Sequence, residues 1–297
     1  MIQGSYQGFD VEIRGSGVAV VTFNKPERLN AMSFGARRDL CEVLTLAQFD
    51  DDVRVVVLTG TGRGFIAGVS NASTAGRDDG PENPTLVQPK PARRDGMSEQ
   101  MAESGHFQPV NLYSQLVHFA QEPVRTLRRL DKLTIAAVNG FAIQLGLTIA
   151  LACDFAISAR SAKLGSATLR MGWQPDEGGH WLLVQHLGVK RAMDFLMNQR
   201  IVTAEQALGL GLVNEVVDDD ALLPRALEMA EQLANGPQAA MRVLKKAVYN
   251  AAQMTFEQAG DDIASKTAVT DHHPDAKEGS AAFFRKEKPR FNKWLEK

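Results

Sequence analysis

The first sixty residues alternate two kinds of hydrophobic pattern, and this alternation limits the possible fold more than any other feature of the sequence. Short apolar blocks at residues 9–13, 18–23 and 53–59 are bounded by Gly, Pro or charged residues, which is typical of β-strands. Between the second and third blocks, apolar residues recur at helical spacing over residues 33–49, with Ser33 as the expected N-cap. A strand, a helix and a further strand form a crossover unit. We therefore predict an α/β fold with mostly parallel strands.

The rest of the chain divides into a long excursion, a second α/β stretch and a helical end. Residues 71–109 are rich in Pro and Gly with mixed charge and no sustained period, which predicts a long loop. The next elements expected are a helix at 110–130, a strand at 133–138, a helix at 145–152 and a strand at 154–159. Beyond Gly188 we expect one strand at 213–217 and helices at 190–199, 203–208, 221–234, 237–249, 256–270 and 276–286. The chain thus reads as a core over residues 1–200 and a helical segment over residues 201–297.

Composition excludes several functional classes. The 297 residues carry 33 Lys and Arg against 35 Asp and Glu, so the net charge of -2 gives no global attraction for nucleic acid or an anionic membrane. The only two cysteines, Cys41 and Cys153, are too few for a disulfide scaffold or a structural zinc site. No signal-peptide pattern opens the chain, and the apolar stretch at 141–157 is interrupted and shorter than the roughly 20 residues that span a bilayer. We expect a cytoplasmic protein without a membrane or nucleic-acid partner.

Several familiar motifs are absent or incomplete. The glycines at Gly60, Gly62 and Gly64 do not complete a GxGxxG dinucleotide motif, and no serine lies in a GxSxG motif. The adjacent His272 and His273 are better explained as a solvated helix end than as metal ligands, so no metal is expected.

Two junctions rich in small residues are the strongest candidates for chemistry. They are residues 65–70, after a predicted strand, and residues 137–142, before an apolar helix. Small residues allow close backbone approach to a ligand, and the first N–H groups of a helix can face negative charge. Two such donors converging on one oxygen would form an oxyanion hole. Both segments are explained equally well as tight turns.

Taken together, ordered motifs resemble those of the crotonase (enoyl-CoA hydratase/isomerase) superfamily. These motifs are NKPERLNA at 24–31, FIAGVS at 65–70, AAVNGFA at 136–142, the segment 172–179 and the segment 275–291. The resemblance runs nearly end to end, and residues 71–109 are longer than the family usually has there. It implies repeated ββα units, a helical segment at 201–297 that builds trimers or hexamers, and an acyl-CoA thioester as substrate with no further cofactor.

The resemblance also assigns site residues. The N–H groups of Val69 and Leu145 would hold the thioester oxygen while an enolate develops. The positions that would meet coenzyme A are Arg28, Asn30, Ala31, Ala67, Gly68, Lys286 and Lys288. The last two match a basic C-terminal patch that meets the CoA phosphates of the same or of a neighbouring subunit.

The sequence departs from the family at the hydratase positions. Family hydratases use two glutamates to add water across a double bond, and these positions are Thr148 and Thr168 here. A threonine hydroxyl does not ionise near neutral pH, so efficient hydration is not expected. The glycine-rich run before the first position is reduced to Gln144-Leu145-Gly146, which could place the Gln144 amide in the pocket.

A carboxylate reappears after Pro175. Isomerase branches of the family place a single catalytic acid there, which matches Asp176, and one carboxylate can move a proton between two carbons. We expect burial and the like charge of Glu177 to raise the pKa of Asp176, and we interpret Glu177 mainly as a helix cap. His180 is either a second polar group of the site or a structural histidine.

We therefore predict an enoyl-CoA isomerase. The alternatives are a hydratase, lyase or hydrolase that uses Asp176, Glu177 or His180 with water, and a non-catalytic CoA-thioester-binding scaffold.

Overall fold

The computed structural model describes residues 1–70, 113–114 and 116–295. The expected excursion at 71–109 lies outside these residues. In the described part of the chain no helix is long and apolar enough to cross a membrane. The same residues contain no cluster of three or more His, Cys, Asp or Glu side chains that could hold a metal ion.

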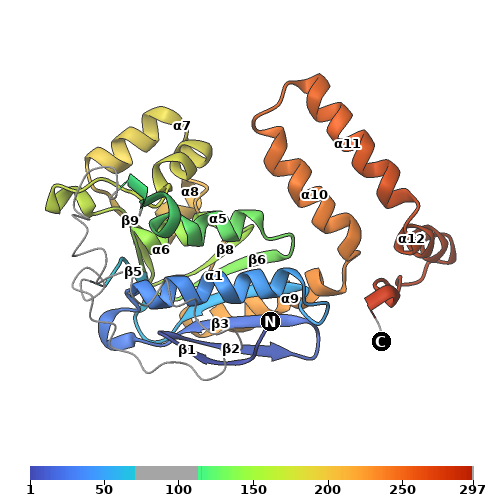
Figure 1. Ribbon diagram of the computed structural model, residues 1–297, viewed down its shortest axis with the longest axis horizontal. Helices are drawn as coiled ribbons and strands as arrows, with labels where there is room; N and C mark the ends of the chain where they lie inside the picture. The colour runs from blue at the N-terminus through green and yellow to red at the C-terminus, as the bar shows by residue number, and fades with distance from the viewer. Residues whose placement is uncertain (71–112, 115, 296–297) are drawn as a thin grey trace.

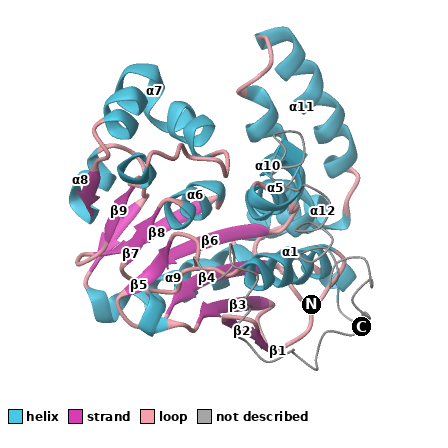
Figure 2. Ribbon diagram, turned by 60° about the vertical axis from the view of Figure 1, so that its left-hand side comes forward, coloured by secondary structure: helices cyan, strands magenta, loops and turns pink. Residues whose placement is uncertain are grey.

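A seven-stranded sheet forms the centre of the molecule (Figure 2). Its strands, in spatial order, are β1 (Gly4–Tyr6), β2 (Phe9–Arg14), β3 (Val18–Phe23), β4 (Val55–Gly60), β6 (Leu133–Val138), β8 (Phe155–Ala159) and β11 (Glu215–Val217). The first three strands pair antiparallel, and the pairs from β3 to β11 are parallel. All six residues of β6 are buried, as its unbroken apolar sequence predicts for a central parallel strand. The α/β prediction is confirmed.

A second sheet was not anticipated from the hydrophobic pattern. Its order is β10 (Ile201–Thr203), β9 (Lys163–Gly165), β7 (Phe141–Ile143) and β5 (Gly64–Ala67). These strands have three or four residues each, too few for a period-two pattern to stand out. The two junctions, for which a tight turn was one of two interpretations, overlap β5 and β7, which pair in parallel. Each strand pair followed by a helix gives the expected ββα repeat.

Helices cover the sheets and connect them. Ser33 caps α1 (Phe34–Gln48) as predicted, because its Oγ accepts the N–H of Ala36 at 3.1 Å. The single helix expected at 110–130 is instead a π-helical turn, η3 (Leu116–Ala120), followed by α5 (Glu122–Arg129). All eight residues of α6 (Leu145–Ala152) are buried, and this helix packs against strands of both sheets. Helix α7 (Gly179–Met197) packs on α6 and is kinked at Gly188.

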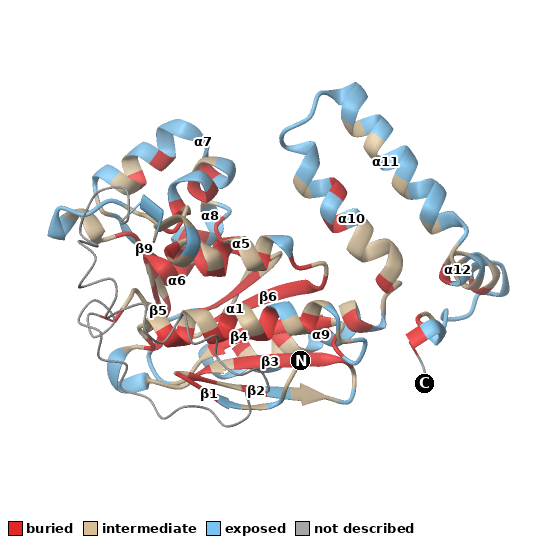
Figure 3. Ribbon diagram, viewed as in Figure 1, coloured by how far each residue is buried: buried red, intermediate tan, exposed pale blue. Residues whose placement is uncertain are grey.

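The remaining helices separate into two groups. Helices α8 (Ala204–Gly209) and α9 (Leu222–Asn235) belong to the body, with α9 packed on β3, β4, β6 and β8. Helices α10 (Gln238–Ala251), α11 (Phe256–Asp271) and α12 (Pro274–Arg285) form an arm that extends from the body and is largely exposed (Figures 1 and 3). The expected boundary at residue 200 is therefore displaced: β10 and β11 complete the two sheets, and the arm starts with α10.

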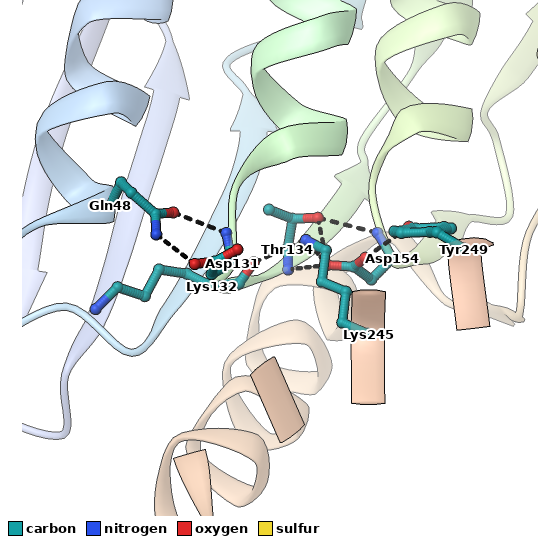
Figure 4. Close-up of polar contacts among 7 residues, drawn as sticks. All are labelled: Gln48, Asp131, Lys132, Thr134, Asp154, Lys245 and Tyr249. Carbon is teal, nitrogen blue, oxygen red and sulfur yellow. Dashed lines mark hydrogen bonds and ion pairs between the residues drawn. The ribbon is translucent and has the colours of Figure 1, made fainter. Parts of the chain in front are cut away.

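Buried polar contacts hold α10 to the body (Figure 4). Lys245 of α10 donates to Asp154 Oδ2 and to the carbonyl of Lys132, both at 2.8 Å. Tyr249, one turn further along α10, donates to Asp154 Oδ1 at 2.6 Å. The N–H and hydroxyl of Thr134 also donate to Asp154, at 2.7 and 2.9 Å. Asp154 thus joins the arm to the start of two core strands.

Candidate active site

The two predicted oxyanion donors lie side by side at the ends of β5 and β7. In the parallel pairing of these strands, Ala67 is opposite Ile143, and Val69 and Leu145 each follow two residues later. Gly146 allows the two elements to approach this closely, because any side chain here would clash: a Cβ would lie 2.0 Å from the carbonyl oxygen of Ile66. The first turn of α6 therefore sits directly against the end of β5.

The amide of Val69 faces away from the neighbouring segment. Met32 forms an isolated parallel bridge with Val69, in which Met32 N–H donates to Gly68 O at 3.1 Å and Met32 O accepts from Ser70 N–H at 3.0 Å. Such a bridge uses the residues on either side of Val69, so the N–H of Val69 points to the opposite side. Leu145 is the first residue of α6, and an N–H at this position has no partner within the helix. The bridge does not use the N–H of Val69, and the helix does not use the N–H of Leu145, as the prediction of two oxyanion donors requires.

The strip at residues 28–31 is held by Asn30. Asn30 is 2% exposed, and its Oδ1 accepts the N–H of Lys25 at 2.7 Å. Its Nδ2 donates to the carbonyls of Thr61 and Gly64, at 3.0 and 2.6 Å. The side chain of Asn30 is thus engaged within the protein, where it fixes the conformation of the strip. Arg28 is exposed, whereas Ala31, Ala67 and Gly68 are half-buried.

A buried polar network surrounds Gln144, the residue before α6. Gln144 Nε2 donates to Glu177 Oε2 at 3.0 Å. Its Oε1 accepts from Ser166 Oγ at 2.7 Å and from Thr168 Oγ1 at 3.3 Å. Thr148 Oγ1 donates to the main-chain carbonyl of Gln144 at 3.0 Å. Both threonines at the hydratase positions therefore lie around Gln144, and the network links them to Glu177.

Two neighbouring carboxyl groups are perturbed by burial. Desolvation is the main cause that raises the pKa of Asp176, which is half-buried, and the pKa of Glu177, which is 3% exposed. The charge of Asp176 also raises the pKa of Glu177. The expected effect of Glu177 on Asp176 was wrong in sign, because hydrogen bonding to Glu177 lowers the pKa of Asp176.

Sequence reasoning missed a basic residue at this site. Desolvation lowers the pKa of Arg37 on α1, while the charges of Asp176 and Glu177 raise it. The Nε of Arg37 is buried and has no hydrogen-bond partner among the described residues. Nothing in the helical pattern of α1 marks Arg37 as special, since only the tertiary packing brings α1 to the loop at 175–178.

The structure bears on two other expectations for this loop. The cap assigned to Glu177 is wrong: Gly178 is the N-cap of α7 without a side-chain bond, and Glu177 binds Gln144 instead. His180 is exposed on the first turn of α7.

The two C-terminal lysines lie far from the other site residues within one chain. Lys286 ends α12 in a left-handed conformation, and Lys288 follows it; both are exposed. Helix α12 is on the opposite side of the molecule from β5 and α7 (Figures 1 and 2). A single chain therefore does not bring these lysines to Val69 and Leu145.

Comparison with known proteins identifies the family of the chain. The family model described as "Enoyl-CoA hydratase/isomerase" matches residues 13–88 and 100–294. The chain belongs to the enoyl-CoA hydratase/isomerase family. The resemblance inferred from the motifs is thus confirmed, as is the crotonase-like fold.

Some relatives are named isomerases and others are named hydratases. A 1,2-epoxyphenylacetyl-CoA isomerase of Escherichia coli strain K12 is 35% identical over 275 residues, which are 93% of this chain and 95% of that protein. A crotonyl-CoA hydratase of Syntrophomonas wolfei is 28% identical and covers 92% of this chain and 94% of its own length. The crystal structure of an enoyl-CoA hydratase from Bacillus anthracis superposes with a TM-score of 0.81 at 26% identity, covering 96% of this chain and 99% of that one.

Proposed function

We propose that this family member is an isomerase that shifts the double bond of an enoyl-CoA from the β,γ to the α,β position. The observation that carries the proposal is a perturbed carboxyl pair, Asp176 and Glu177, joined through Gln144 to the first turn of α6, where Leu145 lies. The positions that bear glutamates in hydratases are Thr148 and Thr168, whose hydroxyls are bonded to Gln144.

The reaction moves one proton. The carboxylate of Asp176 takes a proton from C2 of the thioester, and the electron pair of that C–H bond moves onto the thioester oxygen as an enolate. The N–H groups of Val69 and Leu145 stabilise the oxygen, each by about 3 kcal/mol if it behaves like other oxyanion donors. The acid form of Asp176 then returns the proton to C4, and the double bond forms between C2 and C3. No water is consumed.

Hydration is the second candidate. It is favoured by the names of several relatives, such as the Syntrophomonas wolfei protein. In that case Asp176, Glu177 or the exposed His180 would have to activate water in place of the missing glutamates.

The same proposal extends to assembly and ligands. We propose a homotrimer or hexamer built through the C-terminal arm, with Lys286 and Lys288 reaching the CoA phosphates of a neighbouring subunit. The acyl-CoA substrate is then the only small molecule required. Neither Cys41 nor Cys153 forms a disulfide bond, which fits the cytoplasmic location that we propose.

Two substrates and one variant test the proposal. A 3-enoyl-CoA and, separately, a 2-enoyl-CoA are incubated with the protein while absorbance reports conjugation and mass spectrometry reports products. We expect conversion of the first substrate without gain of water, and a loss of about a hundredfold to ten-thousandfold in kcat/KM for Asp176→Asn.

Three outcomes would contradict it. Full activity of Asp176→Asn removes Asp176 from the mechanism. Rapid water addition to the 2-enoyl-CoA identifies a hydratase. Tight CoA binding with neither reaction identifies a scaffold.

A further inference from the structure

Gln144 occupies a backbone conformation that a side chain makes costly. Its φ is 53° and its ψ is −101°, at the point where β7 ends and α6 begins. Glycine adopts positive φ freely, whereas other residues do so at a cost in backbone energy. A glutamine at this point indicates that its side chain does something that glycine could not.

Both ends of the Gln144 amide are fixed. Ser166 Oγ and Thr168 Oγ1 donate to Oε1 at 2.7 and 3.3 Å, so Nε2 is directed to Glu177 Oε2, at 3.0 Å. Gln144 and Ser166 are 7% and 4% exposed, so water does not compete freely for these contacts. Oε2 of Glu177 is therefore occupied by a donor.

The charges around the carboxyl pair do not balance if both groups are ionised. Among the residues that the structure describes, Arg37 of α1 is the cation that acts on Asp176 and Glu177, and Cys41 on the same helix acts on Arg37. The hydroxyls of Ser166, Thr148 and Thr168 are neutral, and His180 of α7 is exposed. A buried and a half-buried negative charge side by side against one positive charge are unfavourable, and one retained proton removes the excess.

We propose that Glu177 holds this proton on Oε1 and donates it to Asp176, and that Gln144 is the positioning residue that enforces this orientation. The side-chain N–H of Gln144 already donates to Oε2 of Glu177, so the acidic hydrogen of Glu177 is placed on its other oxygen, Oε1. Asp176 then stays ionised as the base, and Glu177 takes no part in proton transfer. The inference rests on the proposed function only in giving Asp176 the role of base.

The electrostatics agree with this arrangement. Hydrogen bonding to Glu177 lowers the pKa of Asp176, and the charge of Asp176 raises the pKa of Glu177. These are the directions expected when the proton resides on Glu177.

The first test removes the amide in two ways. Gln144→Met keeps the strained backbone and loses the hydrogen bonds, whereas Gln144→Gly also relieves the strain and should fold at least as well as the wild type. Without the amide, Glu177 no longer aims its hydroxyl at Asp176, so the pKa of Asp176 rises. Because the base must be ionised, the variants lose activity on the acidic side of the profile, and we expect the acidic limb of kcat/KM to move to higher pH in both of them.

The control for the Gln144 variants is a glutamine substitution far from the carboxyl pair. Gln253→Met, which replaces an exposed glutamine of the arm, should leave the profile unchanged. If both Gln144 variants keep the wild-type profile, Gln144 does not position the pair.

The second test asks whether Glu177 is neutral. Glu177→Gln retains an N–H donor toward Asp176, whereas Glu177→Ala loses it at a cost of about ten- to a hundredfold in kcat/KM, the effect of one hydrogen bond to a charged group. We therefore expect the glutamine variant to recover most of the activity lost in the alanine variant. Difference infrared spectroscopy should also show a protonated-carboxyl band that both Glu177 variants lack.

The outcomes separate this inference from the proposed function. If Asp176→Asn is fully active, the proposed function fails, while the infrared band still reports on Glu177. If Asp176→Asn is inactive and Glu177→Gln is equally inactive, or the band is missing in the wild type, the proposed function stands and this inference is overturned.

Discussion

At the scale of single residues, the candidate site depends on close approach between the starts of two helices. A Cβ on Gly179, the first residue of α7, would lie 2.4 Å from Thr148 Oγ1 on α6. This contact joins a position that bears glutamate in family hydratases to the loop that carries Asp176. The identities of residues 148 and 179 are therefore coupled through space.

We expect Gly179→Ala to destabilise the protein through this overlap. Overpacking of this kind typically costs about 1–3 kcal/mol in the free energy of unfolding. Thr148→Ala removes the clashing atom, so the double variant should recover much of that loss, as measured by urea denaturation of all four proteins in a double-mutant cycle. Additive effects would show that the backbone moves α7 away instead.

At the scale of elements, the arm is attached through one helix. Lys245 and Asp154 are nearly buried, with 4% and 8% side-chain exposure, so their ion pair is shielded from water. Desolvation lowers the pKa of Lys245, and Asp154 opposes this effect. The neighbouring Lys246 pairs with Asp131 at 2.6 Å but is 56% exposed. The two adjacent lysines thus provide a buried and an exposed ion pair on the same helix.

Lys245→Met should destabilise the protein far more than Lys246→Met. Removing one partner of a buried pair leaves Asp154 without its counterion and costs about 3–5 kcal/mol, whereas exposed pairs contribute about 0–1 kcal/mol. Thermal unfolding measures the difference, and hydrogen exchange should show faster exchange in α10 for Lys245→Met. Similar losses for both variants would mean that the buried pair does not anchor the arm.

At the scale of the whole molecule, the arm exposes large apolar side chains. Phe256, Phe283 and Phe284 are 87%, 79% and 83% exposed, and they lie on α11 and α12. Their aromatic surface would be covered in the assembly that we propose.

We expect Phe283→Ser combined with Phe284→Ser to lower the assembled mass in light scattering. Serine removes most of the apolar area that would be buried between chains, and Lys277→Ser on the exposed face of the same helix is the control. An unchanged mass in the double variant would place the contact elsewhere.

The local pattern accounts for much of the fold. Alternating and continuous apolar runs predicted β3 and β6 with their observed bounds, as well as α6, because burial in these elements follows the hydrophobic period. The strands β5, β7, β9 and β10 were not predicted. They have three or four residues each, and their pairing partners are distant in sequence.

The candidate site divides in the same way. The ordered motifs by themselves determined the family, the junction that contains Val69 and the apolar helix that begins at Leu145. Tertiary structure alone decided that Arg37 faces the carboxyl pair and that Glu177 binds Gln144 rather than capping α7. The reason is physical: a backbone turn is encoded by residues next to one another, whereas the proton balance of a buried carboxyl depends on groups on α1, after β9 and at the start of α6, which only folding brings together.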